Sequence, residues 1–118
     1  GGDGVKELEE LEKRKDEKKN KAEDRIKKFK DEAKYADDRT EDKEKLAHRW
    51  IALALDIIGD AFNLKEEARR RFLRHKFRGE LDDSKKEYAE KEMKRFEDDV
   101  EKDAEELAQK AKEAFKEG

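Results

Sequence analysis

The chain has 118 residues, of which 57% are charged and 32% hydrophobic, and its formal net charge at neutral pH is −3. It contains no cysteine and no proline, which excludes disulfides, thiol nucleophiles and cysteine-ligated metals. The length suits one domain. A mean hydropathy of −1.48 is typical of disordered chains, but closely mixed Glu and Lys residues favour helix instead.

The first predicted helix covers about residues 5–36. Lys15 and Lys18 interrupt its apolar face, and we expect their stems to lie along the core with the ammonium groups near the acidic run at 97–106. Residues 1–4, Gly-Gly-Asp-Gly, are interpreted as a flexible, tag-like segment. No signal peptide or other targeting signal is recognised, since no basic segment precedes an apolar run.

The second predicted helix covers about residues 40–78, with Asp38 or Thr40 as its N-cap. Its first half is the most apolar stretch of the chain, LAHRWIALALDIIGDAF (Leu46–Phe62). A break at Gly59–Asn63 would give a fourth helix. However, polar residues before and after Gly59 keep to one sector when placed at about 100° per residue. We therefore expect one long helix, with any bend or break near Gly59.

The third predicted helix covers about residues 84–116. Gly79 is expected to end the second helix in the left-handed conformation, and Ser84 with Glu87 forms a capping box for the third. Apolar residues then follow one stripe of this helix, as in a surface helix that faces a core. Residues 1–118 are thus predicted to form a single all-α domain, an antiparallel three-helix bundle, with a four-helix bundle as the alternative if the middle helix is broken.

Antiparallel packing predicts two apolar layers. One end would join Val5, Leu8, Leu11, Phe72, Leu73, Phe77, Tyr88 and Met93, and the other Ile26, Phe29, Trp50, Leu53, Ile57, Leu107 and Phe115. The apolar sector of Leu46–Phe62 exceeds about 200° of the helix, more than a surface helix needs. We expect a homodimer or a bent four-helix arrangement to cover the remainder. The same stretch is too short and too charged to span a membrane.

Uncharged polar side chains other than tyrosine are very few, while helix-forming residues fill most positions: the complete set is Asn20, Thr40, Asn63, Ser84 and Gln109. This composition resembles that of de novo designed helical bundles, with charge-rich proteins of thermophiles as the alternative. The resemblance to designed bundles implies a structural scaffold without catalytic activity.

A local resemblance lies in Phe72–Phe96, FLRHKFRGELDDSKKEYAEKEMKRF. The turn Arg78-Gly79-Glu80-Leu81, the capped acidic start after it and the aromatic Tyr88 resemble the SHOCT type of short helical hairpin. The likeness covers about a fifth of the chain. It implies protein–protein association, with no catalytic residues to carry over.

An arginine group is the main candidate for a binding site. Arg70, Arg71, Arg74 and Arg78 fall on one outward stripe near the end of the second helix. Clustered cations of this kind are what nucleic acid or another anionic partner requires. Glutamates one turn earlier can pair with two of them, and the chain is acidic overall. A solvated, stabilising face is therefore the preferred interpretation, with an anion-binding module as the alternative.

His48 and His75 are the only histidines and raise the alternative of a haem or metal site. They project from opposite sides of one helix, so one chain cannot aim both at a single ligand. The Glu-x-x-His pairs of di-iron bundles, the calcium-loop spacing and the glycine-rich phosphate loop are all missing. Ser84 and Thr40 are interpreted as caps. We therefore predict no enzyme, no cofactor and no metal.

Overall fold

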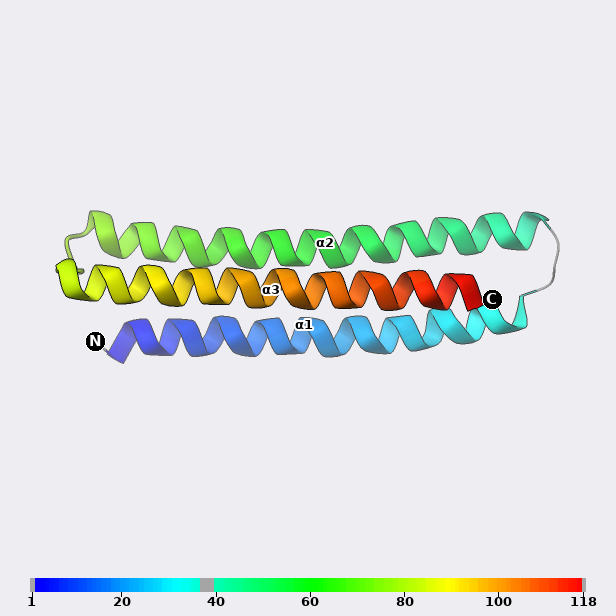
Figure 1. Ribbon diagram of the computed structural model, residues 1–118, viewed down its shortest axis with the longest axis horizontal. Coiled ribbons are helices and arrows are strands. Elements are labelled where there is room, and N and C mark those ends of the chain that lie inside the picture. The colour runs from blue at the N-terminus through cyan, green and yellow to red at the C-terminus, as the bar shows by residue number, and fades with distance from the viewer. Residues whose placement is uncertain (1, 37–39, 118) are drawn as a thin grey trace.

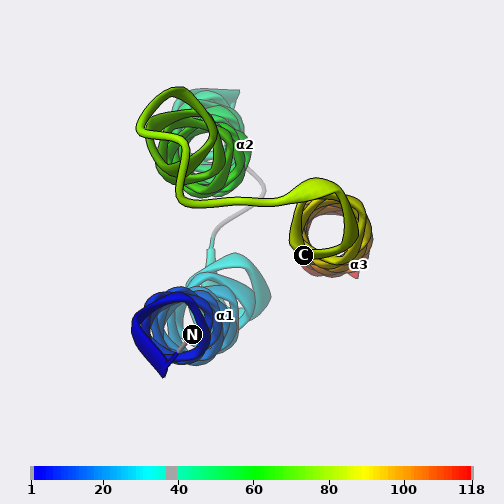
Figure 2. The ribbon, with the colours of Figure 1, turned by 90° about the vertical axis from the view of Figure 1, so that its left-hand side faces the viewer.

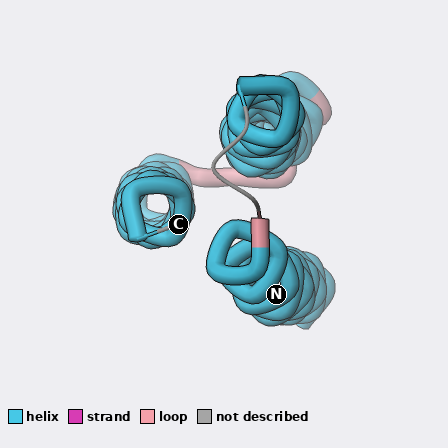
Figure 3. Tube along the Cα trace, turned by 90° about the vertical axis from the view of Figure 1, so that its right-hand side faces the viewer, coloured by secondary structure: helices cyan, strands magenta, loops and turns pink. Residues whose placement is uncertain are grey.

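Three long helices form the protein in a computed structural model, which describes the backbone of residues 2–36 and 40–117 and the side chains within 6–36 and 41–117. The helices α1 (Gly2–Tyr35), α2 (Thr40–Phe77) and α3 (Asp83–Glu117) alternate in direction along a body of 62 × 18 × 15 Å (Figure 1). They stand at the corners of a triangle when viewed along the long axis (Figures 2 and 3). The predicted all-α, antiparallel three-helix bundle is confirmed.

The middle helix is unbroken. α2 continues from Thr40 to Phe77 with Gly59 inside it, so the four-helix alternative is wrong. A glycine in a helix interior costs only about 1 kcal/mol relative to alanine, and buried Ile57 and Leu64 anchor the helix on either side of it. The caps predicted at Asp38 and Thr40 lie outside the described residues and side chains. α1 begins at Gly2, where the sequence predicts a flexible segment at 1–4.

The end of α2 is closed by backbone hydrogen bonds. Gly79 has a φ of 68°, the left-handed conformation that glycine adopts at little cost, as predicted. The amide of Glu80 donates to the carbonyl of His75 at 3.1 Å, and the amide of Gly79 donates to the carbonyl of Lys76 at 3.1 Å. This pair of bonds defines a Schellman motif.

The start of α3 is capped by Asp82 rather than Ser84. The Oδ1 atom of Asp82 accepts a hydrogen bond from the amide of Lys85 at 2.9 Å, which is the bond of an N-cap residue to the third helical residue. The prediction of Ser84 as the cap is therefore wrong by two residues. The helix begins at Asp83, since the three residues between Gly79 and Asp83 suffice to reverse the chain.

Buried apolar side chains form two clusters along the bundle. The large cluster lies where α1 ends and α2 begins, and contains Ile26, Phe29, Ala33, Leu46, Leu53, Ile57, Leu107, Ala111 and Ala114. The small cluster lies toward the α2–α3 turn, and contains Leu11, Leu64, Ala68, Phe96 and Val100. Trp50 stacks on Phe115 beside the large cluster, with ring centroids 5.0 Å apart and planes within 8°. The indole Nε1 of Trp50 is buried without an acceptor among the described residues.

The predicted layer at the turn end is only partly confirmed. Leu8, Leu11 and Met93 join the small cluster, but Phe77 and Tyr88 are 80% and 66% exposed. The reason is the direction in which these side chains leave their helices. At about 100° per residue, Phe77 lies about 180° round α2 from buried Ala68, and Tyr88 lies about 120° round α3 from buried Val100. Val5 lies outside the described side chains.

The apolar stretch Leu46–Phe62 is divided between two environments. One side of it faces α1 and α3 and supplies Leu46, Leu53 and Ile57 to the large cluster. The other side faces outward with four large aliphatic or aromatic side chains exposed by half or more: Ile51, Leu55, Ile58 and Phe62. The expectation that the whole stretch exceeds what two neighbours can cover is consistent with this division.

Candidate functional site

The four candidate arginines lie in two environments. Arg70 is 3.8 Å from Glu66. Arg71 is bonded to Glu67 at 2.8 Å and reaches Glu10 of α1 at 3.5 Å. Arg74 and Arg78 are exposed and form no ion pair with other described side chains. The stripe is therefore not a uniform cationic face, because two of its members already have carboxylate partners. Binding of nucleic acid or another anion there stays an alternative prediction.

Glu67 is the centre of the ion-pair network around Arg71. One carboxylate oxygen accepts from Arg71, and the other accepts from Arg14 of α1 at 2.6 Å. The hydrogen bond from Arg14, together with that from Arg71, lowers the pKa of Glu67 against the opposing effect of burial. These contacts fix α2 against α1, so we interpret this part of the arginine group as structural.

His75 is held between two carboxylates. Its Nδ1 contacts Glu80 in the α2–α3 turn, and its Nε2 lies 2.6 Å from an oxygen of Glu7 in α1. The hydrogen bonds with Glu80 and then with Glu7 raise the pKa of His75. Both ring nitrogens carry protons only in the imidazolium form. The arrangement is therefore a charged clamp that ties the turn to α1.

The two candidate histidines are far apart. His48 is exposed and lies 27 residues before His75 in the same helix, which is about 40 Å at a rise of 1.5 Å per residue. One ligand cannot contact both within a single chain. Among the described residues, no group of three or more His, Asp or Glu is placed to hold a metal ion. The haem or metal alternative therefore stays a prediction.

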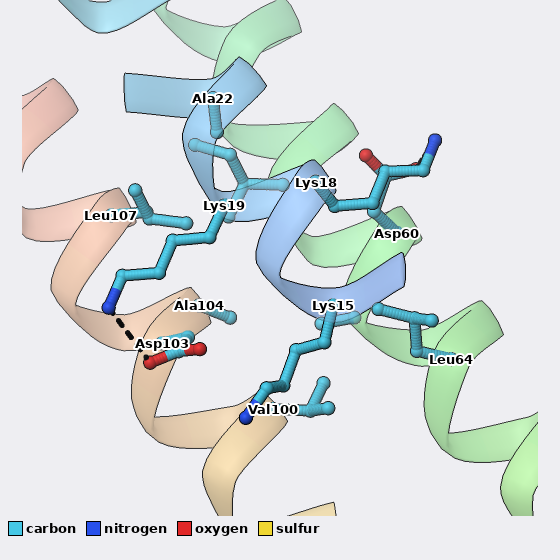
Figure 4. Close-up of a pocket in the computed structure, with 12 residues that line it drawn as sticks. Lys15, Lys18, Lys19, Ala22, Asp60, Leu64, Val100, Asp103, Ala104 and Leu107 are labelled. Atoms are coloured by element: carbon cyan, nitrogen blue, oxygen red, sulfur yellow. Dashed lines mark hydrogen bonds and ion pairs between the residues drawn. The ribbon is translucent and has the colours of Figure 1, made fainter. Parts of the chain in front are cut away.

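Three lysine side chains of α1 extend to the neighbouring helices (Figure 4). The ammonium groups of Lys15 and Lys19 lie 3.9 Å from Asp99 and 3.4 Å from Asp103, inside the predicted acidic run of α3. The Coulombic attraction of Asp103 raises the pKa of Lys19. Lys18 instead reaches Asp60 of α2 at 3.7 Å, so its expected pairing with α3 is wrong.

Two hollows in the described part of the bundle are small. The first, of about 30 Å³, lies below these lysines where the lining alanines of all three helices leave space: Ala22, Ala61 and Ala104. It has room for water but not for an organic substrate. The second, of about 250 Å³, lies between α1 and α3 and is bordered by lysines and glutamates that pair across it, such as Lys110 with Glu23 at 3.7 Å.

The most unusual surface feature is the outer stripe, which we define as Ile51, Leu55, Ile58 and Phe62 on α2. Their exposed fractions are 50%, 62%, 57% and 60%. Spacings of four, three and four residues place them in one row. A contiguous apolar patch of this kind marks an interaction surface more often than scattered exposed residues do. The sequence indicated surplus apolar width here, but it did not identify which side chains would face outward.

Comparison with protein-family models, with curated proteins and with solved structures finds no match for this chain. The resemblance to SHOCT hairpins therefore stays a prediction, although the hairpin of α2 and α3 has the expected turn at Gly79. Within the described residues, every helix is too short in its apolar part, or too charged, to cross a membrane.

Proposed function

We propose that this chain is a structural helical-bundle scaffold without catalytic activity, and that it acts by helix–helix association through the outer stripe of α2. The observation that carries the proposal is the row of four large apolar side chains, each at least half exposed, in a chain that is 57% charged. A bundle needs only charged residues on its surface to stay in solution, so the exposed apolar row requires another explanation. A second copy of the chain is the proposed partner.

The energetics favour a weak, concentration-dependent association. Complete burial of one Leu, Ile or Phe side chain contributes about 1.5–3 kcal/mol, and each member of the stripe has about half of its surface left to bury. Association costs an estimated ~4–15 kcal/mol in lost freedom of motion. Four side chains from each copy therefore contribute a burial free energy comparable to this cost. Since a micromolar dimer requires a surplus of about 8 kcal/mol, we expect a weak dimer that forms only at high protein concentration.

Other properties of the chain support the scaffold role. The ion pairs on the remaining surface are mostly between helices, for example Arg14 with Glu67 and Lys65 with Glu101, and so fix the arrangement of the bundle. The hollow enclosed between the three helices, of about 30 Å³, is too small for an organic substrate. Each of these features belongs to the packing of the helices rather than to a reaction.

We also propose that the sequence is of the designed type. The helices have 34, 38 and 35 residues, one turn combines a Schellman motif with an aspartate cap, and uncharged polar residues are nearly absent. Idealised bundles are usually very stable, so we expect a midpoint of thermal unfolding above about 90 °C. A cooperative transition near about 50 °C, ordinary for a mesophilic domain, would contradict this proposal.

Sedimentation velocity over a wide range of protein concentration tests the association. We expect the unmodified chain to shift from monomer to dimer, and Phe62→Glu to remain monomeric. Phe77→Glu is the matched control, because Phe77 is also exposed, on the same helix, but outside the stripe. Circular dichroism should give the same helical content for both variants. A chain that stays monomeric at all concentrations would refute self-association.

A further inference from the structure

The outer stripe is the centre of a longer row with mirror-like order. Continuing the alternating spacing of four and three residues in both directions adds Glu44 and His48 before the stripe, and Lys65 and Arg69 after it. The midpoint of this row lies between residues 56 and 57. Of the four pairs of residues at equal distances from it, Leu55 with Ile58 and Ile51 with Phe62 are both apolar, acidic Glu44 is complementary to basic Arg69, and His48 is paired with Lys65.

This order distinguishes the two ways in which a second α2 helix can lie on the first. In an antiparallel pair centred on the midpoint, each apolar residue faces an apolar residue and Glu44 of each copy faces Arg69 of the other. In a parallel pair, Glu44 faces its own copy and Arg69 likewise, which places like charges together at both ends. Unlike charges across a helix pair set partner orientation, and like charges oppose it.

The residues beside the row also suit a second helix. Ala52, Ala54 and Gly59 flank the apolar part, and a Cβ atom added at Gly59 would meet nothing within 4 Å in the chain itself. Small residues let two helices approach closely, whereas an interfacial helix on a membrane carries Lys and Arg beside its apolar face. Figure 2 shows α1 and α3 on one side of α2, and the stripe residues are at least half exposed, so the two helices do not obstruct the approach.

Lys65 and Arg69, the two basic residues after the stripe, are both held by carboxylates of α3. Lys65 is bonded to Glu101 of α3, which draws its ammonium group away from the row. Arg69 is 3.2 Å from Glu97 and its side chain is 60% exposed. A guanidinium has five N–H donors, so Arg69 can bind a second carboxylate from another copy.

From these observations we infer that a second copy docks on the first through α2 in an antiparallel orientation, with a two-fold axis between residues 56 and 57. The inference rests on the proposed self-association and specifies its geometry. Ile51 packs on Phe62 of the other copy, Leu55 packs on Ile58, and two Glu44–Arg69 pairs close the ends. Such an interface uses the same surface of both copies.

Charge reversal tests the orientation. Glu44→Arg alone brings two guanidinium groups together at each end of the interface, and Arg69→Glu alone brings two carboxylates together. Each variant should therefore weaken its dimer by about tenfold. An equimolar mixture of the two should recover the affinity of the unmodified chain, because both pairs are again of opposite charge. Glu105→Arg, an exposed reversal on α3, is the control and should change nothing. Circular dichroism checks that each variant is folded.

Engineered cysteines provide a second measurement that leaves the charges intact, since the chain has no cysteine of its own. Mixed and allowed to equilibrate in a thiol–disulfide buffer, Ile51→Cys and Phe62→Cys should form the mixed disulfide in preference to either homodimer. Single charge variants that dimerise as well as the unmodified chain, a mixture that binds more tightly than the unmodified chain, or preferred 51–51 and 62–62 disulfides would overturn the antiparallel geometry while leaving self-association intact. An unmodified chain that remains monomeric would instead overturn both. Association only with lipid vesicles would assign the stripe to a membrane surface and likewise overturn the inference.

Discussion

The large and small clusters, at opposite ends of the bundle, differ in what holds the helices together. The large cluster has nine buried apolar residues and is accompanied by separate, exposed ion pairs such as Lys30 with Glu117. The small cluster has five buried apolar residues but is surrounded by connected networks. Arg95 alone contacts Glu12 of α1 at 2.7 Å and Asp99 at 3.1 Å.

This difference indicates a division of roles along the molecule. Apolar burial supplies most of the free energy of folding, so the large cluster should dominate stability. Ion pairs at the surface contribute about 0–1 kcal/mol each, but they form together only when the helices have one axial alignment. We therefore expect the small-cluster end to be the weaker one, and its networks to determine register more than stability.

The largest test of this comparison uses two leucines of α2 that are both 4% exposed. Leu53 belongs to the large cluster, and Leu64 belongs to the small cluster and lines the 30 Å³ cavity. Leu→Ala in a core costs about 2–5 kcal/mol. We expect Leu53→Ala to lie near the upper end of this range and Leu64→Ala near the lower, because the surroundings of Leu64 are less tightly packed. Urea unfolding at low protein concentration measures both, and equal losses would contradict the comparison.

The glycines provide a second test, with effects of opposite sign. Gly59 lies in α2 between Ile57 of the large cluster and Leu64 of the small one, and there is open space where its Cβ would be. Gly59→Ala should raise the free energy of unfolding by about 0.5–1 kcal/mol. Gly79→Ala should lower it by about 1–2 kcal/mol, because its φ of 68° is unfavourable for alanine. Thermal unfolding of both variants would be compared with the unmodified chain, and a destabilised Gly59→Ala would indicate a functional bend at this junction.

Removal of the Glu67 charge tests the networks of the small-cluster end. Glu67→Gln should cost about 1 kcal/mol, whereas Glu32→Gln, which removes the exposed partner of Arg49 near the large cluster, should cost much less. The pKa of Glu67 is lowered from its ordinary value of 4.5, so its contribution is present above that pH and is lost as the pH falls through the lowered value. Urea unfolding of Glu67→Gln and the unmodified chain should therefore converge in acid. If the difference in free energy of unfolding between the two proteins persists in acid, the cause is packing and not charge.

The smallest expected effect belongs to the His75 clamp. The pKa of His75 is raised from 6.5, so its stabilisation is complete below that pH and is lost as the pH rises through the raised value. We expect His75→Gln to lower the free energy of unfolding by less than about 1 kcal/mol in mild acid and to have little effect in alkali. His48→Gln is the matched control for loss of a histidine at the other end. A pH-independent effect of His75→Gln would exclude the charged clamp.

The sequence predicts the long middle helix correctly because a helix keeps its phase through a single glycine, and the polar residues on both sides of Gly59 preserve that phase. It predicts Gly79 correctly because few other residues adopt a positive φ. The exposure of Phe77 and Tyr88 follows from the same phase, because both lie well off the buried faces of their helices. The layer prediction fails for them because it groups residues by position along the bundle and ignores their direction around the helix.

The candidate sites depend on how the helices are placed against one another, which no local pattern encodes. The sequence indicates that the apolar sector of Leu46–Phe62 is wider than two neighbouring helices can cover. Which side chains form the outward row depends on how α2 is rotated relative to α1 and α3. The pairing of Arg71 with Glu67 follows from their four-residue spacing. The contacts of Glu67 with Arg14, and of His75 with Glu7, join residues more than fifty positions apart, and therefore require the relative position of α1. Asp82 and Ser84 are both good caps, and only the path of the turn selects between them.

The stacking of Trp50 on Phe115 gives the molecule a built-in optical reporter. Trp50 is the only tryptophan, and its ring lies against the last turns of α3 beside the large cluster. Its fluorescence will therefore record the detachment of that end alone, while the far-ultraviolet signal of the helices records the whole chain. Coincident transitions would mean that the two ends unfold as one cooperative unit. A fluorescence change that follows the loss of helix would reveal a partly unfolded state in which only the large cluster survives.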